Sequence, residues 1–216
     1  MPDLEPRSPR KPSPLAPPLP LAPRAGSGLE LRAAQPEPTE ADFDPSPETP
    51  LPPWAEGWID TGAGRVLRVK SAPLFRDRLD LLRSRLVRRR ERIRVAPGLY
   101  ALGSPGDSTP VFVTANYKPS FDALRFALSH RDAWLLVLDT GGVNVWCAAG
   151  KGRFGDAELL RRLRASGLER IAPRADLVLP QLGATGVGAW KIAKETGRRV
   201  RVGPVRAADL GAWLDS

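Results

Sequence analysis

The stretch Trp134-Leu135-Leu136-Val137-Leu138-Asp139 is an apolar run that ends in a carboxylate. A short apolar run bounded by polar and turn residues is typical of a strand that is buried on both faces of a sheet. We predict this strand and three others, at Val111–Ala115, Trp134–Asp139, Leu177–Pro180 and Arg199–Val202.

Helical segments follow each of these strands. The predicted helices are Ser120–Ser129, Asp156–Ala165, Val187–Thr196 and Ala207–Asp215. Gly197 directly follows the third helix, where a glycine commonly ends a helix in the left-handed conformation. This alternation of strands and helices predicts an α/β fold, with a mostly parallel sheet and covering helices.

The segment before these strands has a different character. Trp58–Asp60 and Arg65–Val69 flank a glycine-rich turn, which predicts a hairpin. Residues 75–92 are predicted to form a helix, because apolar residues at helical spacing share one face while arginines occupy the rest. The arginines form either a solvated face or a docking patch for an acidic protein or a membrane surface.

Composition divides the chain near residue 53. Sixteen of the 24 prolines lie in residues 1–53, which carry a net charge of −3, whereas residues 54–216 carry +12. A proline-rich segment without apolar periodicity cannot bury enough surface to offset its ordering entropy. We therefore expect a disordered Pro-rich tail (1–53), a hairpin with a basic helix (54–94) and an α/β domain (95–216). The basic charge of the last two parts favours anionic partners or ligands.

The single cysteine and single histidine exclude several kinds of site. One cysteine cannot form an intrachain disulfide, and one cysteine with one histidine cannot form the usual zinc site. An iron–sulfur cluster held by this chain alone would need about four cysteines. Residues 1–30 lack a signal-peptide pattern, and no apolar run approaches the roughly 20 residues of a membrane span, which predicts a cytoplasmic protein.

Four loops rich in glycine or short polar residues follow the predicted strands, at residues 114–119, 139–155, 181–186 and 203–206. In open α/β sheets, ligands bind beyond the carboxyl ends of the strands, where these loops are expected to meet. The second loop is much the longest, and long loops at this edge are commonly functional. It contains Cys147.

Several interpretations of Cys147 compete. A free cysteine is most often a small buried hydrophobe. The run Gly150–Gly155 has the G-x-G-x-x-G spacing of a dinucleotide site, but it begins 11 residues after Asp139 and no acid ends the next strand, which argues against a nicotinamide cofactor. His130 is predicted at the opposite edge of the sheet, which disfavours a Cys–His catalytic pair. No nucleic-acid-binding module accompanies the arginines, so no nucleic-acid partner is expected.

A single protein thiolate can serve as a metal ligand when the metal is already bound within a macrocycle. A cobalt corrin supplies its own ring nitrogens and leaves axial positions, and one soft protein thiolate can fill the lower of these. A short helix that starts near Asn144 would hold Cys147 below such a ring. The small residues Ala148, Ala149 and Gly150 would then permit close approach.

The cysteine motif closely resembles the cap-helix motif of the corrinoid protein of microbial mercury methylation. It reads Asn144-Val145-Trp146-Cys147-Ala148-Ala149-Gly150-Lys151 and continues Gly152-Arg153-Phe154-Gly155. More distantly, residues 57–215 resemble the corrinoid-binding domain of the gamma (large) subunit of the corrinoid iron–sulfur protein of the acetyl-CoA synthase/CO dehydrogenase pathway. Supporting segments are Arg94–Tyr100, Val113–Lys118, Ser120–Arg125, Leu179–Gly183 and Gly203–Arg206.

The resemblance implies a Rossmann-like domain that binds a cobamide, a cobalamin-type corrinoid with cobalt, in the base-off form. It implies that Cys147 is the lower axial ligand of the cobalt and hence the catalytic residue. The expected cofactor-binding residues are Thr114, Asn116, Lys118, Asn144, Val145, Trp146, Cys147, Ala148, Ala149, Gly150, Lys151, Gln181, Leu182, Gly183, Gly203 and Pro204.

The function implied by the nearer resemblance is that of a corrinoid-dependent methyltransferase. A methyltetrahydrofolate-linked donor would load a methyl group onto cobalt, Hg(II) would receive it, and a ferredoxin-like iron–sulfur protein would serve as reductant. Two alternatives stay open: a corrinoid-binding protein of the acetyl-CoA pathway type without mercury chemistry, and a basic interaction protein with a structural cysteine. Mercury-methylation proteins also carry a membrane domain, so we expect this chain to reach the inner face of the membrane only through a partner.

Overall fold

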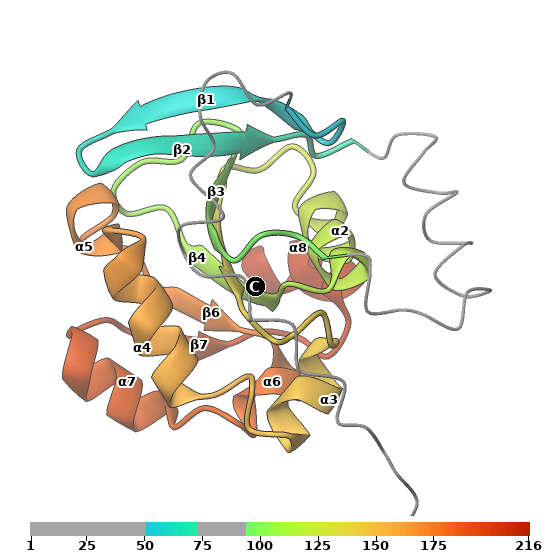
Figure 1. Cartoon of the computed structure of the whole chain (residues 1–216), viewed down its shortest axis with the longest axis vertical. Coiled ribbons are helices and arrows are strands. Elements are labelled where there is room, and N and C mark those ends of the chain that lie inside the picture. Colours follow the sequence, from blue (N-terminus) through green and yellow to red (C-terminus); the bar gives the residue numbers. More distant parts are fainter. Residues whose placement is uncertain (1–50, 73–93) are drawn as a thin grey trace, which may run out of the picture. The chain divides into compact units, whose positions relative to one another are not determined.

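The computed structural model describes residues 51–72 and 94–216, all of which lie within one compact unit. In this part of the chain, a seven-stranded sheet runs in the order β1-β2-β3-β5-β4-β6-β7 (Figure 1). The strands are β1 (Ala55–Thr61), β2 (Gly64–Val69), β3 (Gly98–Leu102), β4 (Val111–Ala115), β5 (Ala133–Leu138), β6 (Leu177–Leu179) and β7 (Val200–Val202). The predicted helix at 75–92 lies outside the described residues, as does nearly all of the predicted tail, so both stay predictions.

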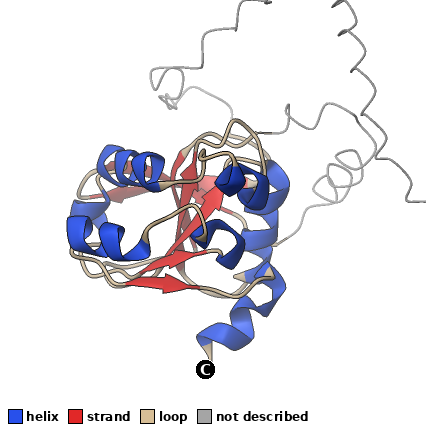
Figure 2. Cartoon of the chain, turned by 90° about the horizontal axis from the view of Figure 1, so that it is seen from below, coloured by secondary structure: helices blue, strands red, loops and turns tan. Residues whose placement is uncertain are grey.

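Helices cover both faces of the sheet, as Figure 2 shows. They are α2 (Lys118–Ala127), α3 (Val145–Gly150), α4 (Asp156–Ala165), α5 (Leu168–Ile171), α6 (Gln181–Ala184), α7 (Ala189–Thr196), the 3-10 helix η3 (Ala207–Asp209) and α8 (Leu210–Leu214). The predicted α/β class is confirmed, and α4 has the predicted bounds. The last predicted helix is divided between η3 and α8, and α2 begins two residues earlier than predicted because Pro119 fits its first turn.

Four neighbouring strands, β5, β4, β6 and β7, are parallel. The register of these strands aligns their ends across the sheet, because Val111 lies opposite both Trp134 and Leu177, and Leu177 lies opposite Val200. The carboxyl ends of all four strands therefore meet at one edge of the sheet, which we call the carboxyl edge. The four predicted loops follow these ends, so the predicted meeting of the loops is confirmed.

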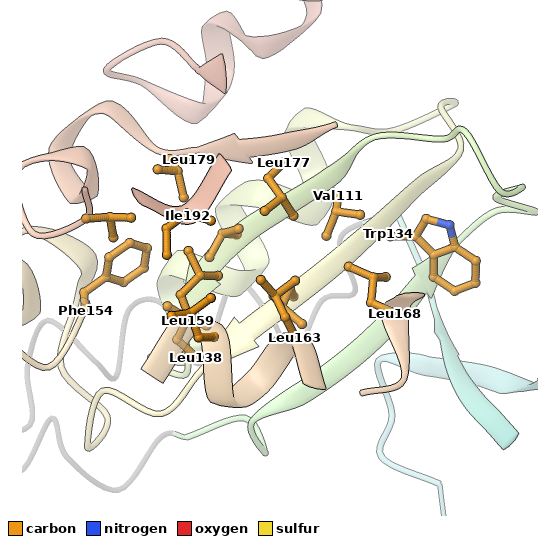
Figure 3. Packing of buried hydrophobic residues seen from close by; sticks show 14 of the residues in the cluster. Val111, Trp134, Leu138, Phe154, Leu159, Leu163, Leu168, Leu177, Leu179 and Ile192 are labelled. Atoms are coloured by element: carbon orange, nitrogen blue, oxygen red, sulfur yellow. The ribbon is translucent and has the colours of Figure 1, made fainter. Parts of the chain in front are cut away.

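Side chains of the central strands alternate between two apolar layers. Trp134, Leu136 and Leu138 of β5 face the layer formed with α4, α5 and α7, and Figure 3 shows part of this packing. Leu135 and Val137 face the other layer, which includes residues of α2 and α8. The apolar run of β5 is therefore buried on both faces, as its sequence predicts.

The predicted hairpin is confirmed as the antiparallel pair β1 and β2. It joins the sheet through β3, which is parallel to β2 and antiparallel to β5. Trp54, Tyr100 and Phe121 pack edge to face, with ring centroids 5.4–5.9 Å apart. Arg125 of α2 donates a hydrogen bond of 2.7 Å to the Lys70 carbonyl. These contacts tie the hairpin to α2.

A buried arginine closes the opposite edge of the sheet. Arg198, with 6% of its surface exposed, donates hydrogen bonds to the carbonyl oxygens of Ala172 (2.7 Å), Ala175 (2.9 Å) and Leu168 (3.1 Å). Burial lowers the pKa of the Arg198 guanidinium, and the Glu169 carboxylate acts in the opposite direction. The guanidinium thus donates to carbonyl groups at the start of the short helix α5 and beyond its end.

Candidate functional site

A pocket of about 350 Å³ lies at the carboxyl edge. It is lined by the ends of β4 and β6, by α2, by the start of α3 and by the segment from Gly203 to α8. The lining residues are Phe112, Val113, Thr114, Ser120, Ala123, Leu124, Asn144, Val145, Trp146, Val178, Leu179, Pro180, Leu182, Gly203, Pro204, Val205, Ala207 and Leu210. Most of them are apolar, and the volume falls in the range of roughly 300–1,000 Å³ that is usual for small-molecule sites.

Some of the residues predicted to bind a cofactor come together in this pocket. They come from all four predicted loops and are Thr114, Asn144, Val145, Trp146, Leu182, Gly203 and Pro204. Segments separated by about 90 positions of sequence thus contribute to one cavity. This convergence is what the parallel arrangement of β4, β5, β6 and β7 produces.

The helix α3 carries the only cysteine of the chain. Asn144 precedes the helix in an extended conformation, and its side-chain oxygen accepts a hydrogen bond of 2.9 Å from the Cys147 backbone N–H. This is the N-cap arrangement that asparagine favours, and it confirms the predicted short helix starting near Asn144. Cys147 is half-buried and directly follows Val145 and Trp146, which line the pocket.

The inner side of α3 is buried against α6 and neighbouring segments. Ala148 and Ala149 belong to the apolar core. A β-carbon on Gly183 would lie 2.6 Å from the Phe154 ring, and one on Gly186 would lie 2.2 Å from the Phe154 carbonyl oxygen. Both positions therefore need glycine because the segments pack closely, and Gly183 lies at this helix contact rather than in the pocket lining.

The remaining predicted cofactor residues also lie outside the pocket lining. Asn116 is buried, and its amide is hydrogen-bonded to the loop after β5. Lys118 forms a buried ion pair of 2.6 Å with Asp122. Gly150, Lys151 and Gln181 are exposed on the surface.

Exposed apolar side chains surround the mouth of the pocket. Trp146 has 68% of its surface exposed, and Leu182 and Val205 are also exposed. All three contribute to the pocket lining. A large ligand could therefore fill the pocket with one part and cover these side chains with another.

Several pocket residues were not anticipated from the sequence. They are apolar residues of β4, β6 and α8, three residues of α2, and three residues that follow β6 or β7: Phe112, Val113, Val178, Leu179, Leu210, Ser120, Ala123, Leu124, Pro180, Val205 and Ala207. Phe112 could have been found from the two-residue alternation of a strand, because it shares one face with the predicted Thr114, whereas its neighbour Val113 points to the other face. The pocket residues of α2 and α8 could not be predicted from the sequence, because their place in the pocket depends on how these helices pack.

Within residues 51–72 and 94–216, no cluster of three or more His, Cys, Asp and Glu side chains could hold a metal ion. The described helices also include none that is long and apolar enough to cross a membrane.

A family model described as CO dehydrogenase/acetyl-CoA synthase delta subunit (CdhD) matches residues 81–214, which is more than half of the chain. The chain belongs to this family. Among similar proteins, the acetyl-CoA decarbonylase/synthase complex subunit gamma of Archaeoglobus fulgidus is 33% identical over 125 residues, which cover 57% of this chain and 26% of that protein. The corresponding subunit of Methanopyrus kandleri is 30% identical over 128 residues, covering 58% of this chain and 27% of that protein.

A bacterial relative of this CdhD-family chain is named for a corrinoid. The corrinoid/iron-sulfur protein large subunit of Moorella thermoacetica is 28% identical over 123 residues, which cover 56% of this chain and 27% of that protein. The chain thus spans about a quarter of the length of these relatives. The comparisons confirm the resemblance to the gamma (large) subunit of the acetyl-CoA pathway, whereas the resemblance to the mercury-methylation protein stays a prediction.

Proposed function

We propose that this chain binds a corrinoid at the carboxyl edge and carries a methyl group in a transfer reaction of the acetyl-CoA pathway type. The observation that carries the proposal is the apolar pocket at that edge, bordered by Asn144, Val145 and Trp146, with Cys147 next in sequence. The family match and the corrinoid in the name of one relative support it.

The residues at this edge suit a corrinoid in three respects. The pocket is apolar and can take one apolar part of the cofactor, since a whole corrinoid exceeds about 350 Å³. The exposed side chains of Trp146, Leu182 and Val205 offer an apolar surface to the remainder. Cys147, a half-buried residue just outside the pocket lining, provides a soft thiol.

Each of these groups has a definable task. Cys147 would hold the cobalt, and Asn144 fixes the first turn of the helix that carries it. Trp146 and Leu182 would exclude water from the apolar part of the cofactor. When bound, the corrin supplies a cobalt ion that accepts and releases a methyl group.

The proposed reaction needs partners. The chain has one cysteine and so cannot hold an iron–sulfur cluster alone, and a ferredoxin-like iron–sulfur protein would supply electrons to the cofactor. A methyltetrahydrofolate-linked donor would supply the methyl group. The relatives are subunits of an acetyl-CoA decarbonylase/synthase complex, so we include the other subunits of such a complex among the expected partners.

Mercury methylation is the second candidate function. It is favoured by the motif from Asn144 to Lys151, which resembles that of the mercury-methylation protein, and by the soft thiol of the half-buried Cys147. A thiolate that holds the cobalt would make the methyl group more electron-rich, which suits Hg(II) as the acceptor.

The test of corrinoid binding uses the purified full-length chain, cobalamin and visible spectroscopy. The parent should shift the cobalamin spectrum to the base-off form, and Cys147→Ser should lose the contribution of the sulfur ligand. The same measurement on Cys147→Ala uses a side chain that offers the cobalt no ligand. A parent protein that leaves the spectrum unchanged at high protein concentration would refute corrinoid binding and favour a basic interaction protein with a structural cysteine.

A second assay separates the two methyl acceptors. The loaded protein is incubated with a reductant and a methyl donor, with and without Hg(II), and methylmercury is measured. Methylmercury that depends on Cys147 would favour the second candidate. Methyl transfer to a partner subunit of the acetyl-CoA type, with no methylmercury formed, would favour the first.

A further inference from the structure

Asn116, the first residue after β4, has only 3% of its surface exposed and lies outside the pocket lining. Its side chain reaches the loop that follows the neighbouring strand β5. Asn116 Oδ1 accepts hydrogen bonds from the backbone N–H groups of Thr140 (3.0 Å) and Gly142 (2.9 Å), and it lies 2.8 Å from the Thr140 hydroxyl. Asn116 Nδ2 donates to Asp139 Oδ1 at 3.0 Å. The oxygen and the nitrogen of the amide are therefore both used within the fold.

The backbone of the loop that Asn116 contacts depends on glycine. Gly141 and Gly142 have φ angles of 69° and 75°, in the left-handed region that other residues rarely adopt. The Gly141 N–H donates to Asp139 Oδ1 at 3.0 Å, and the Gly142 N–H donates to Asn116. The side chains of Asp139 and Asn116 thus fix two successive peptide groups of one tight loop.

This loop leads directly into α3. Asn144, two residues beyond Gly142, caps the helix and binds the Cys147 N–H. The far end of α3 is held separately, by close packing of Ala149 against Gly186. The hydrogen bonds of Asn116 therefore act on the end of α3 that precedes Cys147.

We propose that Asn116 is a positioning residue for Cys147: by holding the β5–α3 loop across two strands, it sets the position of Cys147 in α3, next in sequence to the pocket residues Val145 and Trp146. An amide suits this position, because its oxygen meets N–H donors while its nitrogen meets the Asp139 carboxylate. An aspartate at position 116 would instead place two carboxylates together. The expected effect of Asn116 on corrinoid binding rests on the proposed function, whereas its expected effect on the position of Cys147 does not.

The test compares the parent with Asn116→Asp, Asp139→Asn and the double exchange that carries both substitutions. The rate at which Cys147 reacts with a thiol-specific disulfide reagent is measured in the absence of corrinoid. Loss of the hydrogen bond from Asn116 Nδ2 to Asp139, together with repulsion between the two carboxylates, should loosen the loop, so we expect the reaction in Asn116→Asp to be about five- to tenfold faster. The double exchange restores one amide and one carboxylate and should bring the rate back to within about twofold of the parent.

The stability control is Arg198→Met, which removes hydrogen bonds at the opposite edge of the sheet. It should leave the thiol rate within about twofold of the parent, because the two sites share no partners. The positioning role is overturned if Asn116→Asp reacts like the parent, if the double exchange reacts as fast as the single variant, or if Arg198→Met speeds the reaction equally.

Cobalamin affinity gives the second readout. It should fall about tenfold in Asn116→Asp and recover in the double exchange. A parent that binds no cobalamin, while the thiol rates follow the expected order, would overturn the proposed function and leave the positioning of Cys147 supported. Normal cobalamin affinity in Asn116→Asp, together with an unchanged thiol rate, would overturn the positioning role alone.

Discussion

Gly183 of α6 packs directly against the ring of Phe154, so that a β-carbon on the glycine would lie 2.6 Å from the nearest ring atom. Phe154 is fully buried, and a side chain of Val145 closes the same space at 2.8 Å. Phe154 has little room to withdraw, because it lies in the close-packed interior. This contact holds α6 against the segment that carries the cysteine motif.

We expect Gly183→Ala to lower the free energy of unfolding by about 1–3 kcal/mol, because the added methyl group overpacks the core. Chemical denaturation measures the change. The matched control is Gly150→Ala at the end of α3, where a β-carbon would meet nothing within 4 Å. The control should change stability by less than about 1 kcal/mol, and equal losses in both variants would contradict the packing argument.

Trp146 and Trp190 offer a second matched pair. Both are largely exposed, at 68% and 75%, but only Trp146 lines the pocket. We expect Trp146→Ala to weaken cobalamin binding by about tenfold, since it removes a large apolar contact surface. Trp190→Ala should leave the affinity unchanged, and both variants should keep the stability of the parent to within about 0.5 kcal/mol. Equal affinities of the two variants in a spectroscopic titration would argue against the pocket as the cofactor site.

Arg198→Met should lower the free energy of unfolding by about 2–4 kcal/mol, because the buried carbonyl groups of Leu168, Ala172 and Ala175 lose a charged donor, and those of Leu168 and Ala172 keep only a backbone N–H donor. Arg199→Met, at the next position, replaces an exposed arginine and serves as the control. It should change stability by no more than about 0.5 kcal/mol. Thermal and urea unfolding of the two variants measure the difference, and similar stabilities would mean that the carbonyl contacts of Arg198 contribute little.

Stability at alkaline pH should depend on Tyr100. Burial raises the pKa of its phenol above the ordinary value of 10, while the charge of Arg162 acts in the opposite direction. The folded chain therefore keeps the phenol proton where the unfolded chain has lost it, and the free energy of unfolding falls as the pH rises above 10. Tyr100→Phe removes this dependence, together with a hydrogen bond of 2.7 Å to the Ala96 carbonyl.

Urea unfolding at several pH values between 8 and 11 checks this prediction. Below pH 10, we expect Tyr100→Phe to be less stable than the parent by about 1 kcal/mol, the usual contribution of one hydrogen bond. Above pH 10, the difference should narrow because only the parent loses stability from the phenol. A constant difference over the whole range would show that the phenol does not carry the pH dependence.

The parallel part of the fold was predictable because its signals are local. The strands at 111–115 and 134–138 are apolar runs that stand out from their surroundings, and α4 shows both helical spacing and acidic residues in its first turn. The rule that ligands bind at the carboxyl ends of such strands then located the pocket, including Thr114 and Leu182.

Other features depend on contacts between distant parts of the chain. β3 was not predicted, because Pro97-Gly98 is typical of a turn and only pairing with β2 and β5 makes the following residues a strand. The helices α5 and α6 span four residues each, which is too short for a helical period to show. The hydrogen bonds of Asn116 join residues more than 20 positions apart, so the sequence could indicate that it lies at the edge but not what it contacts.

The pairing of β3 with β5 also affects how the chain behaves in solution. All six residues of β5 are buried, and β3 covers the backbone edge that β4 leaves open. A shortened version beginning after Leu102 would keep every pocket residue, yet it would expose a flat apolar strand with unpaired backbone groups. Such edges recruit further copies and lead to aggregation. The first three strands contribute no side chain to the pocket, but they keep the part that forms it from self-associating.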